Sequence, residues 1–118
     1  MSQLTPVALC KCLADETRLH AVMLLSRYGE LCVCDLVGAM AQPQPTVSRH
    51  LAQLRACDLV TARRAGQWMH YRLADDLPEW AISVMEQLGA AAGEHSADLW
   101  QRASACCAPS QQPERSNA

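Results

Sequence analysis

Residues 32–56 read CVCDLVGAMAQPQPTVSRHLAQLRA and predict two short helices separated by a turn. Leu36 and Met40 lie four residues apart, so they share one face of the first helix. Pro43 and Pro45 cannot continue that helix, whereas a proline suits the first turn of the next one. The expected buried face of the second helix comprises Val47, Leu51 and Leu54. Two short helices joined by a tight turn form a helix-turn-helix.

The flanking sequence predicts a mainly α fold with a small β-hairpin. Further helices are expected over residues 6–14, 15–28 and 78–103. Residues 59–64 and 68–73 are rich in β-forming side chains and lie on either side of an Ala-Gly-Gln turn. A hairpin that directly follows the second helix of a helix-turn-helix is the wing of a winged helix, so we expect a winged helix-turn-helix.

Length and composition predict one domain that acts in the cytoplasm. The chain has 118 residues, of which 50% are hydrophobic and none is Phe, which suits one core of Leu, Val, Ala and Met. No apolar run approaches the roughly 20 residues that span a bilayer, and the N-terminus lacks a secretory signal pattern. We expect a domain over residues 1–104 and a flexible, cysteine-containing tail over residues 105–118, where Ser, Gln and Pro are frequent.

Positive charge is concentrated in the second helix of the motif and in the hairpin. Residues 44–73 hold five arginines and one acid, a net charge of +4, whereas the rest holds five basic and eleven acidic residues, a net charge of −6. A basic stripe on an acidic body is typical of a DNA-binding surface. The candidate groove contacts are Gln44, Thr46, Ser48, Arg49 and His50, and the candidate phosphate or minor-groove contacts are Arg63, Arg64 and Gln67.

Cys32 and Cys34 stand directly before the predicted helix-turn-helix. Two thiolates are suitable ligands for a soft metal or metalloid ion. The chain has seven cysteines and no secretory signal, a combination that favours metal binding or redox work over a disulfide framework. In a regular helix, residues i and i+2 point about 200° apart. Both sulfur atoms can therefore face one ion only if Cys32 lies at or before the helix start, or if the first turn is distorted.

Four stretches of the chain resemble the ArsR/SmtB family of metalloregulatory repressors. They are residues 13–19 (LADETRL), 30–36 (ELCVCDL), 44–51 (QPTVSRHL) and 66–73 (GQWMHYRL). The resemblance implies a homodimeric winged helix that binds double-stranded operator DNA and dissociates when trivalent arsenic or antimony binds. It also implies a dimer interface made by the first and last helices.

Three possibilities remain for the third ligand position. Trivalent arsenic favours three thiolates in a pyramid, and the resembling repressors carry a third cysteine at the position that Val37 occupies here. Cys10 or Cys12 is one source, and two thiolates alone would suit an organoarsenical that already carries one carbon. The tail is the source we favour, and the predicted ligand set is therefore Cys32, Cys34, Cys106 and Cys107.

Parts of the pattern are compatible with other functions. A cadmium-, lead- or zinc-responsive repressor of the same fold would use other ligands. Glu94, His95 and Asp98 in the expected last helix are candidates, but their spacing indicates a metal site only weakly. A redox-responsive repressor would pair two cysteines in a disulfide. A thiol oxidoreductase is disfavoured, because the chain has no βαβ pattern and no Cys-x-x-Cys spacing. We therefore predict a repressor and not an enzyme, with trivalent arsenic or antimony as its inducer and no organic cofactor.

Overall fold

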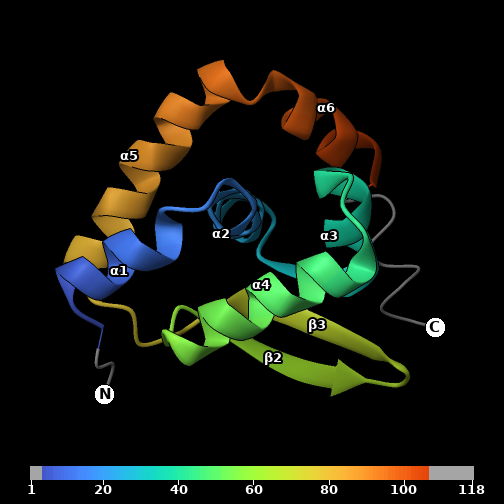
Figure 1. Cartoon of the computed structure of the whole chain (residues 1–118), viewed down its shortest axis with the longest axis horizontal. Helices are drawn as coiled ribbons and strands as arrows, with labels where there is room; N and C mark the ends of the chain where they lie inside the picture. Colours follow the sequence, from blue (N-terminus) through green and yellow to red (C-terminus); the bar gives the residue numbers. More distant parts are fainter. Residues whose placement is uncertain (1–3, 107–118) are drawn as a thin grey trace.

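The computed structural model describes residues 4–106, apart from the side chain of Glu94, and shows a hairpin at the edge of a helical body (Figure 1). The helices are α1 (Pro6–Leu13), α2 (Glu16–Tyr28), α3 (Val33–Met40), α4 (Gln44–Ala56), α5 (Glu79–His95) and α6 (Ala97–Cys106). The strands β1 (Glu30–Cys32), β2 (Val60–Ala65) and β3 (Trp68–Leu73) form one antiparallel sheet in the order β1-β3-β2. Helices α3 and α4 followed by the β2–β3 wing confirm the predicted winged helix-turn-helix.

Local sequence signals set the ends of the first helices. The carboxylate of Asp15 accepts a hydrogen bond from the backbone N–H of Arg18 at 3.1 Å and caps α2. Gly29 ends α2 at a φ of +87°, a conformation that glycine adopts without steric cost. Ala41 ends α3 in the left-handed region, and this reverses the chain into the turn before α4.

The core is built mainly from Leu, Val, Ala and Met, as the composition predicted. The expected buried face of α4 is confirmed, because Val47, Leu51 and Leu54 all have an exposed fraction of 0%. Burial of one such side chain stabilises a fold by about 1.5–3 kcal/mol. Other fully buried leucines come from α1, α2, β1, α3, the α4–β2 connection and α6, and they are Leu9, Leu24, Leu25, Leu31, Leu36, Leu59 and Leu99.

Strand β1 was not predicted. It pairs with β3, so that Glu30 lies opposite Arg72 and Cys32 lies opposite His70. The expectation that the third helix begins at residue 32 is wrong, since α3 begins at Val33. A strand of three residues leaves no periodic pattern to recognise.

The expectation of one long helix over residues 78–103 is also wrong. Ser96 interrupts it with φ −131° and ψ 43°, so that α5 and α6 form an arc over α2 (Figure 1). Helix α6 continues to Cys106 and includes the first two residues of the segment that we expected to be a tail. Residues 107–118 lie outside the described part of the chain.

Apolar side chains of α5 lie on both its inward and its outward face. Ala81, Met85 and Ala92 are its buried residues, whereas Trp80 and Val84 are exposed. None of the helices within residues 4–106 is both long enough and apolar enough to cross a membrane.

Candidate DNA interface and thiol site

The N-terminal half of α4 presents most of the predicted groove contacts. Gln44 and Arg49 are exposed, and Thr46 and Ser48 are half-buried. The apolar face of the same helix is fully buried, which fixes the side from which these polar side chains project. This half of a recognition helix is the part that meets base edges when the helix enters a major groove.

His50 does not share that surface. It is buried, and its Nδ1 lies 3.3 Å from the Arg18 guanidinium and 3.8 Å from a carboxylate oxygen of Asp15. His50 therefore connects α4 to the start of α2, and we leave it out of the proposed DNA contacts. The physical reason is its position one residue before Leu51, where the helix surface turns toward the core.

The wing presents Arg64 and Gln67 to solvent on either side of Gly66, whose φ of +64° suits a tight turn. Arg63 is also exposed, but it is held by Glu30 through two hydrogen bonds of 2.6 and 3.0 Å. These bonds from Arg63 lower the pKa of the Glu30 carboxyl, against the opposing effect of its partial burial. Arg63 thus fastens β2 to the strand that carries Cys32.

Cys32 is the residue that lets two sulfur atoms meet. Its backbone is extended, with φ −76° and ψ 157°, and it forms the N-cap of α3. Its Sγ accepts a hydrogen bond from the Cys34 N–H at 3.3 Å and lies 2.7 Å from the Cys34 Sγ. The Cys32 N–H in turn donates to the buried carboxylate of Asp35 at 3.1 Å. Cys32 thus meets one of the two conditions under which both sulfur atoms can face one ion, since it lies before the first residue of α3.

Helix α6 brings Cys106 to the sensor helix. A Cβ atom added at Gly38 would lie 2.7 Å from the Cys106 Sγ, so this sulfur rests directly on the glycine. Gly38 is four residues after Cys34 and shares its face of α3. Arg102 strengthens the contact by donating from Nε to the Ala39 carbonyl at 2.8 Å. The sequence reasoning missed Gly38, although a glycine inside a short helix signals a close approach.

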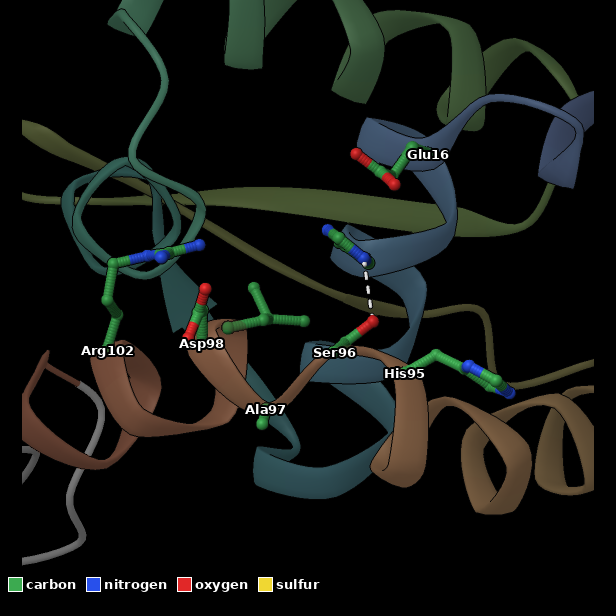
Figure 2. Close-up of a pocket in the computed structure, with 8 residues that line it drawn as sticks. Glu16, His95, Ser96, Ala97, Asp98 and Arg102 are labelled. Carbon is green, nitrogen blue, oxygen red and sulfur yellow. Dashed lines mark hydrogen bonds between the residues drawn. The ribbon is translucent and has the colours of Figure 1, made fainter.

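The break at Ser96 is what turns α6 toward α3. The Ser96 Oγ and the His20 Nε2 lie 3.2 Å apart across a cavity of about 380 Å³ between α2 and the α5–α6 junction (Figure 2). Burial lowers the pKa of His20, since it disfavours the charged imidazole. A neutral His20 bound to Ser96 therefore anchors the junction at neutral pH.

Preformed clusters of three or more metal-ligating side chains are absent from residues 4–106. Cys32, Cys34 and Cys106 therefore do not form such a cluster in this structure. His95 and Asp98 both line the Ser96 cavity, but they form no such cluster. Cys107 lies outside the described residues.

Two further cysteines form a long-range disulfide. Cys12 near the end of α1 is bonded to Cys57, the C-cap of α4, across a sequence separation of 45 residues. Cys12 was one possible source of a third thiolate, and in the structure its sulfur is committed to this bond instead. Packing of α1 beside α4 brings the two together, and no local pattern announces it. Cys10 is exposed.

Comparisons with known proteins agree with this geometry. Residues 15–62 match the family described as "Bacterial regulatory protein, arsR family". The chain is 54% identical over 87 residues to the arsenical resistance operon repressor of Escherichia coli (strain K12), with 74% of each chain covered. That relative is named as a repressor and not as an enzyme.

Two solved structures extend the comparison to the fold. The crystal structure of the AntR antimony-specific transcriptional repressor is 31% identical, with a TM-score of 0.62, and the match covers 82% of this chain and 89% of that one. The homodimeric winged helix-turn-helix DNA-binding domain of Mb0332 from Mycobacterium bovis is 31% identical, with a TM-score of 0.60 and coverage of 76% and 80%. The chain therefore belongs to the arsR family of bacterial regulatory proteins, as its motifs predicted.

Proposed function

We propose that this protein is a transcriptional repressor that binds operator DNA as a homodimer and leaves it when trivalent arsenic or antimony binds Cys32 and Cys34. The observation that carries the proposal is the N-cap position of Cys32, which brings two sulfur atoms to within 2.7 Å at the start of the helix-turn-helix. The names of the relatives, an arsenical resistance operon repressor and an antimony-specific repressor, support a metalloid inducer. A repressor of bacterial genes acts in the cytoplasm.

The DNA contacts follow from exposure and charge. Arg49 projects from the reading half of α4 and is suited to a bidentate bond with guanine. Gln44, Thr46 and Ser48 lie beside it on the same half-helix, and Arg64 and Gln67 reach the backbone from the wing. Arg63 contributes less, because its guanidinium is already neutralised by Glu30.

The homodimer is supported by apolar side chains left on the outer faces of α1 and α5. Val7 is 64% exposed, and Trp80, Ile82 and Val84 are 38–42% exposed. The inward face of α5 already packs on the core through Ala81 and Met85. The outward face is therefore a second apolar surface, which a second copy of the chain would cover. We expect Trp80→Glu to produce monomers in light scattering, with Gln87→Glu as an exposed polar control on the same helix.

A third thiolate comes from α6 in this proposal. Trivalent arsenic held by Cys32 and Cys34 has room for one more thiolate, and Cys106 already rests one helical turn beyond Cys34. Closing that gap requires α6 to slide along α3 or the first turn of α3 to unwind. Cys107 is the other candidate of the tail. Binding is thus coupled to movement of α3, and α3 is joined to α4 by the short turn after Ala41.

The test measures release of DNA from the full-length protein. A duplex that the protein binds is first selected from a random library, and its release is then monitored by fluorescence anisotropy. Arsenite, antimonite, methylarsenite, cadmium, zinc and hydrogen peroxide are compared as releasing agents. We expect the trivalent metalloids to release the wild-type protein and Cys10→Ser, and to leave Cys34→Ser bound. Release by peroxide but not by arsenicals would overturn the metalloid proposal, and the absence of any selected duplex would overturn the repressor proposal.

The source of the third thiolate is tested with Cys106→Ser/Cys107→Ser. Methylarsenite needs only two thiolates, so it should still release this variant, whereas arsenite should require a higher concentration. An unchanged arsenite response would remove the tail from the site and leave a two-thiolate sensor.

The DNA surface is tested with Arg49→Ala and Arg64→Ala. Loss of a bidentate base contact at Arg49 should cost about 1–3 kcal/mol and relax the selected sequence. Loss of a phosphate contact at Arg64 should weaken all duplexes alike and reduce the salt dependence of log K by about one unit. Equal behaviour of the two variants would contradict this division of roles.

A further inference from the structure

The Cys12–Cys57 disulfide has no part in the thiol site proposed above. Cys12 lies near the end of α1, and Cys57 is the C-cap of the DNA-reading helix α4. The bond therefore joins the helix that carries Val7 of the proposed dimer surface to the C-terminus of the helix that carries Arg49. The disulfide is thus a covalent cross-link between these two surfaces.

The two helices are held together by other contacts as well. Arg18 donates from Nε to the Cys12 carbonyl at 2.7 Å and from its guanidinium to the Gln53 side chain at 2.6 Å. Arg18 of α2 thereby bridges α1 and α4 beside the disulfide. These bonds keep the two cysteines near each other when the disulfide is opened, so the two sulfur atoms can pair again.

Small reagents have access to the sulfur atoms. Cys12 and Cys57 line a cavity of about 300 Å³ together with Ala8, Lys11, Arg18 and Gln53. Cys57 is half-buried and is the more accessible of the two, since Cys12 is only 5% exposed. Lys11 and Arg18 place positive charge beside the pair, and such neighbours favour the thiolate, which is the attacking form of cysteine.

We propose that Cys12 and Cys57 form a reversible redox site that responds to hydroperoxides and sets how tightly the repressor holds DNA. The Cys57 thiolate attacks a peroxide oxygen, the O–O bond breaks, and a sulfenic acid and an alcohol or water are formed. The Cys12 sulfur then attacks the sulfenic sulfur, and the S–S bond forms as water leaves. In sum, two thiols and one hydroperoxide give one disulfide, one alcohol or water, and one water. A dithiol reverses the step by exchange.

Oxidation strengthens DNA binding in this scheme, which rests on the proposed repressor function. Two unbonded sulfur atoms need more space than two bonded ones, so reduction loosens the α1–α4 junction. The disulfide fixes the position of α4 relative to α1. Because α1 belongs to the proposed dimer surface, the disulfide also fixes the spacing of the two recognition helices in the dimer. A surface already ordered before binding loses less entropy on binding.

The experiment uses the full-length chain with Cys10, Cys32, Cys34, Cys106 and Cys107 replaced by serine, so that only Cys12 and Cys57 remain. The matched control carries Cys57→Ser in addition. Both are treated with hydrogen peroxide and then with dithiothreitol, and binding to the selected duplex is measured in each state. We expect peroxide to remove two hydrogen atoms from the first protein only and to tighten its binding about fivefold or more, with dithiothreitol reversing both changes.

The outcomes separate the two proposals. Equal or weaker binding after oxidation would overturn the redox inference and leave the repressor intact, whereas no binding in either state would overturn both. If the serine background fails to fold, the wild-type protein gives the chemical answer. Trypsin cleaves after Lys11, Arg18, Arg55 and Arg63, so a disulfide between peptides 12–18 and 56–63 is separated from Cys10. Absence of that linked pair after peroxide treatment would overturn the inference.

Discussion

Two cysteine pairs in this molecule lie in opposite settings. Cys32 and Cys34 are one residue apart, belong to the start of one helix, and leave Cys34 exposed. Cys12 and Cys57 are 45 residues apart, join two helices, and leave Cys12 buried. The local pair changes the shape of a few residues when it binds an ion, whereas the distant pair restrains a large part of the chain. The first is suited to sensing and the second to stability and to the placement of α4.

Removal of the distant pair should have the largest effect on stability. Opening a loop of this length removes about 4 kcal/mol of unfolding free energy on the chain-entropy model. We expect Cys12→Ala/Cys57→Ala to lose about that amount relative to the oxidised protein, while its release by arsenite is retained. Urea unfolding at one fixed protein concentration measures the change, and Cys10→Ala is the exposed control. A loss below about 1 kcal/mol would place the pair among ordinary buried cysteines.

Substitution of Gly38 should have the next largest effect. It tests whether the contact of α6 with α3 takes part in metalloid sensing by Cys32 and Cys34. The added Cβ of Gly38→Ala would displace the Cys106 sulfur, and the helix preference of alanine offsets part of the about 1–3 kcal/mol that overpacking of this kind costs. We expect a lower Tm and a weaker response to arsenite. Gly89→Ala is the matched control, because nothing lies within 4 Å of its added Cβ and alanine favours a helix. A Gly38→Ala protein with wild-type Tm and response would separate α6 from the sensor.

Substitution of Cys32 should separate sensing from stability. Serine is a preferred N-cap, so Cys32→Ser should keep the hydrogen bond to the Cys34 N–H and change the unfolding free energy by less than about 1 kcal/mol. The same change should abolish release of DNA by arsenite. Thermal unfolding and anisotropy on one preparation test both statements. A large loss of stability would show that Cys32 is mainly structural.

The smallest effect concerns Glu30, which anchors the strand that ends at Cys32. Arg63 lowers the pKa of Glu30 below its ordinary value of 4.5. The pair therefore stabilises the fold fully above about pH 4.5, and this contribution is lost as the pH falls through the lower pKa of the folded state. We expect Glu30→Gln to cost about 0.5 kcal/mol at pH 7, with the cost decreasing as the pH is lowered toward 3. Urea unfolding at both pH values tests this, and a cost that is undiminished at pH 3 would assign the effect to packing.

The same contrast explains how much the sequence revealed. Spacing rules found α3, α4 and the wing, since apolar periodicity and two prolines are local signals. They did not find β1, whose three residues depend on β3 for their hydrogen bonds. They also missed the break at Ser96, which depends on His20 of a distant helix. The Cys12–Cys57 bond and the inward turn of His50 depend likewise on packing between elements.

Cys32, the last residue of strand β1, contacts the wing, the start of α3 and the second cysteine of the pair. Its backbone lies opposite His70 of the wing, its sulfur caps the helix that leads to α4, and the same sulfur touches Cys34. An ion that pulls this sulfur out of its capping position strains the wing strand and the recognition helix at once. The groove contact and the backbone contact are then lost in the same event. We therefore expect dissociation to be all-or-none for each protomer, without a state that still holds DNA by the wing alone.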